Sequence, residues 1–156
     1  MAICKKHKSC IKLLDSKITL INKEKKLNIT ESRKYIYDVI AGSHKMIKAY
    51  EILAIIAKKN PSIKPPTIYR AINFLIENNL VHKINCTNSY IACFNKNLTQ
   101  MCFFLICKKC KNVTESYNNK LSELLLNTIK KNNFFLKDAN LEINGICNNC
   151  LLSKNK

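Results

Sequence analysis

Two C-x-x-C pairs restrict what this chain can fold into more than any other feature. Cys107 and Cys110 form the first pair, Cys147 and Cys150 form the second, and thirty-six residues separate them. Each pair fits a tight knuckle, so four sulfurs can reach one tetrahedral Zn²⁺ at about 2.3 Å. We therefore predict a structural zinc site that requires residues 107–150 to fold as one compact unit.

A thiol redox protein is the alternative from another functional class. That activity expects a single C-x-x-C pair in a βαβ setting, whereas this chain has two pairs. The sequence also shows no paired nucleophile and base. We predict that the protein is not an enzyme and has no small-molecule substrate.

A third group of ligand-type residues lies near the N-terminus. Cys4, His7 and Cys10 have C-x-x-H-x-x-C spacing, but no second half of a site accompanies them. We interpret them as free thiols and a free imidazole on a helix or tail, and metal binding by them stays open.

The chain is strongly basic, with 27 Lys and Arg against 10 Asp and Glu in 156 residues. Charge alone fits a nucleic-acid partner or a solvated Lys-rich surface equally well. The longest apolar runs are too short to span a bilayer, and residues 1–20 contain no secretory signal. We expect a cytoplasmic protein with no membrane partner. Arginine occurs only at Arg33 and Arg70.

The hydrophobic period indicates helices first and strands later. Thr30 is a suitable N-cap for a helix that ends just before Gly42, with Tyr35, Ile36, Val39 and Ile40 on its apolar face. We predict helices over 9–26, 31–41, 45–59 and 65–79, then strands over 80–84 and 89–94. This order is that of a winged helix-turn-helix preceded by a basic helix.

The second half alternates strands with a helix around the two knuckles. We predict strands over 102–106, 112–117 and 134–143, and a helix over 120–131. The fold class is therefore α+β: a winged helix-turn-helix domain over 1–94, a hinge over 95–101, and a small α/β zinc-stapled domain over 102–156.

Several motifs together resemble the ferric-uptake-regulator family. Lys64-Pro-Pro-Thr-Ile-Tyr-Arg-Ala-Ile-Asn-Phe-Leu75 is similar to its recognition-helix signature. Leu80-Val-His-Lys-Ile84, Asn88-Ser-Tyr-Ile-Ala-Cys93, Ile106-Cys-Lys-Lys-Cys110 and Gly145-Ile-Cys-Asn-Asn-Cys150 are similar to its zinc-sensing branch. The resemblance covers about residues 22–150.

The resemblance implies a homodimer on palindromic double-stranded DNA, with two Zn²⁺ ions in each protomer. A regulatory zinc at the hinge takes ligands that match His82, Cys93 and Glu115. The hinge histidine of the family is missing, because Gln100 occupies its position. Cys102 lies two residues on, so strand alternation places it on the same face as position 100 and makes it a candidate ligand. The alternative is that Cys102 is a buried strand residue and that Gln100 or a water molecule completes the site.

The DNA-binding residues follow from the same resemblance and from side-chain chemistry. Helix 66–78 is expected to enter the major groove. There the Arg70 guanidinium can donate two hydrogen bonds to the O6 and N7 atoms of a guanine. Tyr50 matches a groove-facing tyrosine, while Lys64, Thr67 and Tyr69 are candidates for DNA contact near the helix N-terminus. Core packing is the alternative role for both tyrosines.

These features predict a zinc-responsive repressor of zinc-uptake genes. An iron or peroxide sensor of the same family is the first alternative, although the Cys93 thiolate favours zinc. A degenerate relative that binds DNA constitutively is the second alternative, because the hinge histidine is absent.

Overall fold

The computed structural model describes residues 29–43, 45–94, 101–137 and 139–153, together with 16, 18, 19, 21 and 27. The predicted helix over 9–26 therefore lies largely outside the described residues. The chain forms two compact units, Met1–Lys96 and Asn97–Lys156, which are treated separately below. Within the described part of the chain, no helix is long and apolar enough to cross a membrane.

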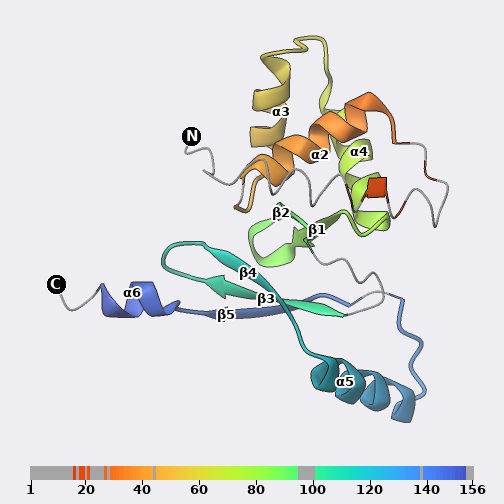
Figure 1. Cartoon of the computed structure of the whole chain (residues 1–156), viewed down its shortest axis with the longest axis vertical. Helices are drawn as coiled ribbons and strands as arrows, with labels where there is room; N and C mark the ends of the chain where they lie inside the picture. Colours follow the sequence, from red (N-terminus) through yellow and green to blue (C-terminus); the bar gives the residue numbers. More distant parts are fainter. Residues whose placement is uncertain are drawn as a thin grey trace. The chain divides into compact units, whose positions relative to one another are not determined.

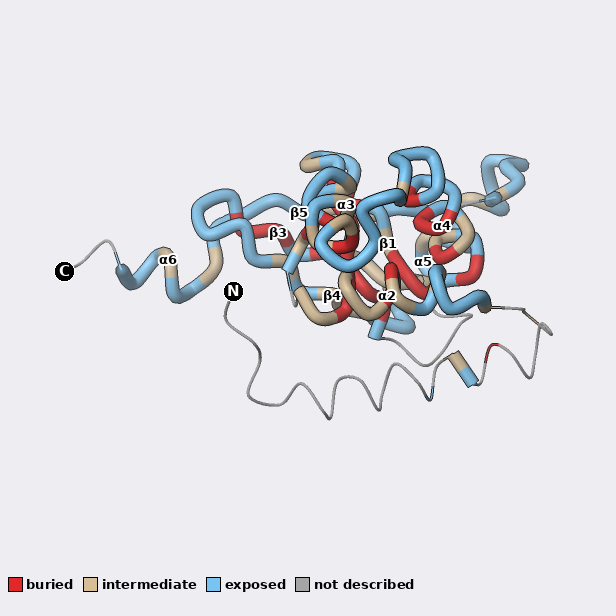
Figure 2. The backbone as a smooth tube through the Cα atoms, turned by 90° about the horizontal axis from the view of Figure 1, so that it is seen from above, coloured by how far each residue is buried: buried red, intermediate tan, exposed pale blue. Residues whose placement is uncertain are grey.

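The first unit contains helices followed by a hairpin, in the predicted order (Figure 1). Its elements are α2 (Glu31–Ser43), α3 (Ala49–Ala57), α4 (Pro65–Glu77), β1 (Val81–Ile84), the 3₁₀ turn η1 (Asn85–Thr87) and β2 (Ser89–Ala92). The core collects one apolar face from each helix together with the hairpin, and Ile36, Ile52, Ile72, Leu80 and Ile84 are almost fully buried. Figure 2 shows these buried stretches along α2, α4 and β1.

Helix α2 begins as predicted and ends later. The backbone N–H of Arg33 donates to Thr30 Oγ1 at 3.4 Å, so Thr30 is the N-cap. Gly42 lies inside the helix rather than beyond its end, and the Ser43 hydroxyl lies 2.7 Å from both the Ile40 and the Lys45 carbonyl oxygens, either of which can accept its proton.

The buried face of α2 is rotated from the predicted one. The helix buries Ile36, Tyr37, Ile40 and Ala41, whereas Tyr35 and Val39 are half-buried. The prediction is therefore right for Ile36 and Ile40. The buried face includes the residue after each of them, Tyr37 and Ala41, instead of the residue before.

Helix α3 is shorter than the predicted helix over 45–59 and has nine residues. Ile47 is used instead in a β-bridge to Tyr90, with N–H to carbonyl distances of 3.0 and 2.8 Å. The helix then starts after Lys48, whose N–H donates to Glu51 Oε2 at 2.8 Å in a capping box. A long-range strand contact thus overrides the local helical period.

Helix α4 and the hairpin agree with the prediction. Pro65 and Pro66 occupy the first turn, where free N–H groups have no helical partner. The helix ends at Glu77 with Asn78 as its C-cap, two residues before the predicted end, and Asn79 has φ of 56°. The Leu80 N–H then donates to the Leu75 carbonyl at 2.9 Å, which joins the hairpin directly to the end of α4.

The second unit is a three-stranded sheet with two helices. Its elements are β3 (Cys102–Cys107), β4 (Val113–Tyr117), α5 (Asn119–Lys131), β5 (Leu141–Gly145) and α6 (Asn148–Leu152). The strand order is β4-β3-β5, in which β3 pairs antiparallel with β4 and parallel with β5. The parallel pair needs a long crossover connection, and the α5 segment lies within it.

The predicted strand over 134–143 is wrong at residues 134–137, 139 and 140, which lie outside β5. The N–H of Phe134 donates to the Ile129 carbonyl at 3.1 Å, and Asn133 has φ of 52°. This stretch closes the C-terminus of α5 with a left-handed residue and cannot also pair as a strand. Phe134 and Phe135 are 67 and 87 % exposed.

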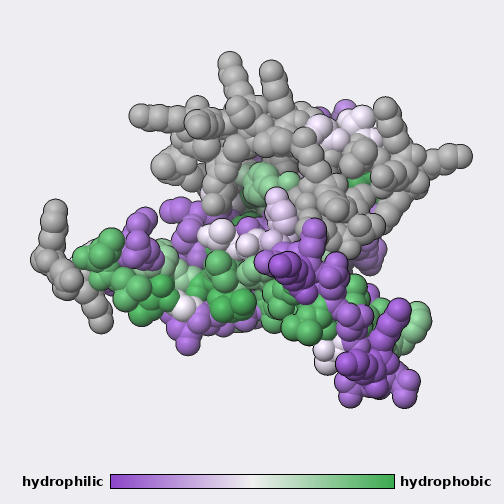
Figure 3. All heavy atoms as spheres, turned by 60° about the horizontal axis from the view of Figure 1, so that its bottom comes forward, coloured by the Kyte–Doolittle hydropathy of each residue, from purple (hydrophilic) through white to green (hydrophobic). Residues whose placement is uncertain are grey.

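The core of the second unit is thin. Among its described residues, only Phe104, Ile106 and Cys107 are buried, and α5 buries none. Figure 3 shows hydrophobic residues at the surface of this unit. A unit with so little buried apolar area needs another source of stability.

Candidate metal centre and nucleic-acid interface

The four predicted zinc ligands lie together at one end of the sheet. Strand β3 ends at Cys107, directly beside Gly145 in parallel β5, and the Lys108 N–H donates to the Gly145 carbonyl at 2.8 Å. The parallel register therefore brings both knuckles to the same edge. The sulfurs of Cys107, Cys110, Cys147 and Cys150 all lie within 4.8 Å of one another.

Each knuckle has its own local turn. The first is closed by the Lys111 N–H, which donates to the Cys107 carbonyl at 2.9 Å, while Lys111 adopts φ of 59°. The second is the first turn of α6, where the Cys150 N–H donates to the Cys147 carbonyl at 3.0 Å. Sequence reasoning predicted the turns but not the helix α6 that forms the second one.

The pKa values of two thiols in this cluster are shifted in opposite directions. Backbone N–H groups of Cys147 and Cys110 lower the pKa of the Cys107 thiol to about 6, the former at 3.3 Å from Cys107 Sγ. Hydrogen bonding from the Cys147 side chain, followed by burial, raises the pKa of Cys150 to about 12. The thiolate form is therefore favoured at Cys107 and disfavoured at Cys150.

The donor set fits Zn²⁺ at this position. Four sulfurs with no oxygen ligand are typical of a closed structural zinc site, and the Cys110 and Cys147 sulfurs approach to 3.7 Å. Lys109 lies across the cluster, where its Nζ donates to the Cys150 carbonyl at 3.3 Å and to Ser153 Oγ at 3.4 Å. This lysine bridges the two knuckles and places a positive charge near the thiolates.

Two of the predicted regulatory ligands share one face of the hairpin in the first unit. His82 lies opposite Ile91, and the Cys93 N–H donates to the Leu80 carbonyl at 2.9 Å, so His82 and Cys93 are diagonal neighbours across the strands. A ring nitrogen of His82 and the Cys93 sulfur lie within 4.8 Å of each other. Cys93 is buried, and His82 is half-buried.

The other predicted regulatory ligands belong to the second unit. Glu115 on β4 lies opposite Phe104 on β3, while Cys102 lies opposite Tyr117. Cys102 and Glu115 are therefore also diagonal neighbours on one sheet face. Gln100, like Cys4, His7 and Cys10, lies outside the described residues.

Helix α4 presents the predicted DNA-contacting side chains outward. Thr67, Tyr69 and Arg70 are exposed, whereas Ile68 and Ile72 turn inward. Among the described residues the Arg70 side chain has no hydrogen bond or ion pair, so its donors are available to a ligand. Lys64 is the N-cap residue and is also exposed.

Both tyrosines for which core packing was the alternative are on the surface. Tyr50 is 65 % exposed and Tyr69 is 50 % exposed. The ammonium group of Lys48 lies 5.9 Å from the centre of the Tyr50 ring. These positions exclude core packing for either side chain.

Sequence reasoning assigned no role to Arg33, and the structure provides one. Its guanidinium lies 3.7 Å from the centre of the Phe74 ring, so a cation–π contact joins α2 to α4. Arg33 is half-buried at this position. The scarcity of arginine in this chain was the signal that could have indicated its importance.

Comparison with known proteins decides the family. The model of the ferric uptake regulator family matches residues 24–144. The chain belongs to the ferric uptake regulator family. It is 30 % identical over 130 residues to the zinc uptake regulation protein of Escherichia coli (strain K12), a match that spans 82 % of this chain and 75 % of that protein. The same values hold for the zinc uptake regulation protein of Shigella flexneri.

Solved structures of family members have the same fold. A zinc uptake regulator in complex with zinc and DNA matches with a TM-score of 0.85 and 28 % identity, over 94 % of this chain and 98 % of that chain. The holo form of XcZur matches with a TM-score of 0.78 and 30 % identity, over 89 and 99 % of the two chains. The predicted α+β fold class is confirmed.

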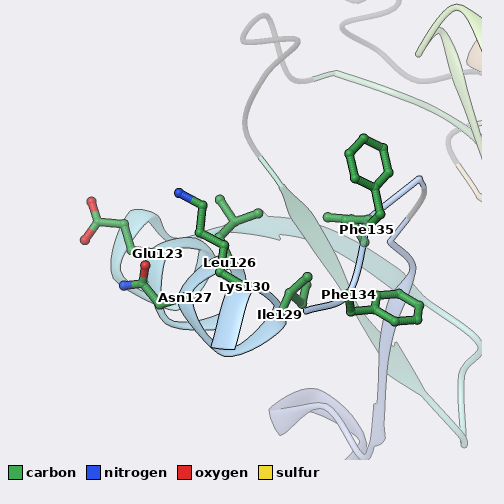
Figure 4. Close-up of a pocket in the computed structure, with 8 residues that line it drawn as sticks. Glu123, Leu126, Asn127, Ile129, Lys130, Phe134 and Phe135 are labelled. Carbon is green, nitrogen blue, oxygen red and sulfur yellow. The ribbon is translucent and has the colours of Figure 1, made fainter. Parts of the chain in front are cut away.

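This family member also has an apolar groove beside α5. The groove has a volume of about 430 Å³ and lies between α5 and the segment that follows it. In Figure 4, Leu126, Ile129, Phe134 and Phe135 provide its apolar wall, and Glu123 lies toward the far end of α5. An exposed apolar surface of this kind is typical of an interface with another chain.

Proposed function

We propose that this protein is a zinc-responsive repressor of zinc-uptake genes that binds palindromic operator DNA as a homodimer. The observation that supports this function best is the placement of His82 and Cys93. They share one face of a hairpin that is hydrogen-bonded to the end of α4, the helix with the exposed Arg70. A metal ligand pair and a DNA-binding helix thus belong to one small unit.

We propose two zinc sites in each protomer. Cys107, Cys110, Cys147 and Cys150 hold a structural zinc, which supplies the stability that the thin core of the second unit lacks. His82 and Cys93 from the first unit and Glu115 from the second hold the regulatory zinc. Cys102, the diagonal neighbour of Glu115, supplies the fourth ligand, and Gln100 or a water molecule is the alternative.

The chemistry of the regulatory ligands favours zinc over iron. The Cys93 thiolate is a soft donor, which zinc accepts in tetrahedral sites alongside imidazole and carboxylate. A metal that takes ligands from both units links them, so that its binding energy favours one arrangement of two DNA-binding units. The half-buried His82 ring and the buried Cys93 sulfur need little reorganisation to act as ligands.

On DNA, α4 enters the major groove and Arg70 contacts a guanine through O6 and N7. Tyr50 packs against a thymine methyl group, while Lys64, Thr67 and Tyr69 contact phosphates near the helix N-terminus. Because Pro65 and Pro66 lack N–H groups, these phosphate contacts come from side chains rather than from the helix backbone.

The second unit forms the dimer. Its apolar groove beside α5 and its exposed sheet residues provide a surface that a second copy covers. Domain boundaries of 1–94 and 102–156, with a hinge over 95–101, assign DNA binding and dimerisation to separate parts of the chain. We place the working protein in the cytoplasm, where its thiols stay reduced.

The test is zinc content per protomer together with operator affinity, with and without a mild chelator. We expect two zinc ions, and we expect chelation of one of them to release the DNA. Cys93→Ser is expected to lose one zinc and the zinc dependence of DNA binding. Cys86→Ser is the matched control, because Cys86 is an exposed cysteine of the same hairpin and belongs to neither proposed site.

One zinc per protomer with chelator-resistant DNA binding would contradict zinc sensing and support the constitutive relative. Tighter operator binding with Fe²⁺ than with Zn²⁺ would support the iron sensor. Loss of DNA binding only after thiol oxidation, with zinc content unchanged, would support a redox protein.

A further inference from the structure

A second polar side chain lies beside Arg70 on the outer surface of α4. Arg70, Asn73 and Glu77 recur at intervals of three and four residues and are all exposed. Such spacing places them on one face of a helix. The opposite face is the buried one, with Ile68, Ala71, Ile72 and Leu75 in the core.

The Asn73 side chain makes no stabilising polar contact with the part of the chain that the structure describes. Among the described residues it has no hydrogen-bond partner. Asn78, the C-cap of the same helix, differs in this respect. Its Nδ2 donates to the Phe74 carbonyl at 2.8 Å and so stabilises the end of α4. Asparagine in a helix interior is less favourable than alanine, so Asn73 costs stability with no compensating hydrogen bond among the residues described.

The orientation of Asn73 is fixed by its neighbour. Phe74 faces α2 and lies under the Arg33 guanidinium at 3.7 Å. This contact adds to the burial of Ile68, Ala71, Ile72 and Leu75, which sets the face that α4 turns to the core and therefore keeps Asn73 on the outer face with Arg70.

We propose that Asn73 determines DNA specificity by contacting an adenine next to the guanine that Arg70 contacts. The proposal rests on the proposed entry of α4 into the major groove. A carboxamide carries a donor and an acceptor in one plane, which match N7 and N6 of adenine. Asn73 lies about 4.5 Å beyond Arg70 along the helix axis, slightly more than the 3.4 Å step between base pairs.

Glu77 marks the end of this contact region. It lies one further turn along the same face, and the last turn of α4 contains no basic residue. A carboxylate there is repelled by the DNA phosphates, so α4 leaves the groove after Asn73. The base-contacting part of the helix then consists of Arg70 and Asn73.

The experiment selects binding sites for the zinc-loaded full chain from a pool of randomised duplexes, and repeats the selection with Asn73→Ala. We expect the wild type to select a guanine followed by an adenine in each half-site, and the variant to keep the guanine but lose the adenine preference. Affinity for the wild-type site is expected to fall about 5- to 150-fold, with affinity for random DNA unchanged.

Two further measurements separate specificity from folding. Asn73→Ala is expected to keep or slightly raise the melting temperature, because alanine is the better helix former. Asn78→Ala is the matched control, since it removes an asparagine amide from the same helix end. We expect it to lower the melting temperature and leave the selected sequence unchanged.

An Asn73→Ala protein that selects the wild-type sequence would overturn the proposal while leaving the proposed function intact. Equal losses on selected and random DNA would also overturn it, because they would make Asn73 a phosphate contact. A wild-type protein that selects no sequence at all would refute the proposed function, and the role of Asn73 would fall with it.

Discussion

Substitution of one proposed structural zinc ligand, Cys147→Ser, tests how the second unit is stabilised. Only Phe104 and Ile106 are buried apolar side chains there besides Cys107, among the residues described. Two such side chains contribute about 3–6 kcal/mol in total. Zinc bound by four thiolates contributes about 10–16 kcal/mol of apparent folding free energy at neutral pH. The metal therefore outweighs the core by about a factor of two or more.

We expect Cys147→Ser to lose the structural zinc, unfold the second unit and give monomeric or aggregated protein. Sedimentation velocity measures the oligomeric state, and amide hydrogen exchange measures protection over β3, β4 and β5 separately from the first unit. Cys86→Ser is the control, because it removes an exposed cysteine outside the cluster. A folded, dimeric Cys147→Ser protein without this zinc would refute the reasoning.

The remaining predictions concern DNA contact, the regulatory site and pH. Arg70→Ala is expected to cost about 1–3 kcal/mol on operator DNA and to relax the preference for one guanine in a binding titration; an equal loss on random DNA would make Arg70 a phosphate contact. Cys102→Ser is expected to weaken the thiolate charge-transfer band of cobalt-substituted protein, and an unchanged band would assign the fourth position to Gln100 or water. Burial, and to a lesser extent Tyr69, raises the pKa of Tyr90. The folded state therefore holds the Tyr90 hydroxyl proton more tightly than the unfolded state does. This difference adds to the free energy of unfolding below pH 10, and the contribution is lost as the pH rises through the raised pKa. In thermal melts above pH 10, Tyr90→Phe should reduce the fall in melting temperature, and parallel curves would contradict this. Lys109→Met is expected to speed zinc transfer to a chromogenic chelator about 2- to 5-fold, whereas the neighbouring control Lys108→Met should not.

Local sequence signals predicted the parts of the fold that depend on local chemistry. Thr30 as N-cap, Pro65 and Pro66 in the first turn of α4, and the two knuckles all act within a few residues. The structure places each of them where the sequence indicated. The element order followed from the same signals.

The errors came from contacts between distant residues. Ile47 pairs with Tyr90, forty-three residues away, and thereby shortens α3. The strand predicted from Phe134 failed because the end of α5 uses that backbone to complete its last turn. Neither of these two competing interactions can be recognised from a few neighbouring residues of sequence.

The residues of the candidate site fall into the same two groups, those predictable from local chemistry and those that depend on contacts between distant residues. The four cysteines could be predicted from spacing alone, because the chemistry of zinc prescribes it. The diagonal pairing of His82 with Cys93 needs the strand register, which the hairpin turn sets. The contact between Arg33 and Phe74 depends on how α2 packs on α4, so no local pattern could indicate it.

The hydrogen bonds around the hairpin limit how a metal signal can be transmitted. Tyr90 ties β2 to the segment before α3, and Leu80 ties β1 to the last turn of α4. These hydrogen bonds couple α4, the proposed DNA-binding helix, to the hairpin that carries His82 and Cys93. If the proposed regulatory zinc binds there, we expect it to act on the first unit as one part, by changing the distance and angle between the two DNA-binding units of a dimer. The spacing of operator half-sites would then be the quantity that zinc controls.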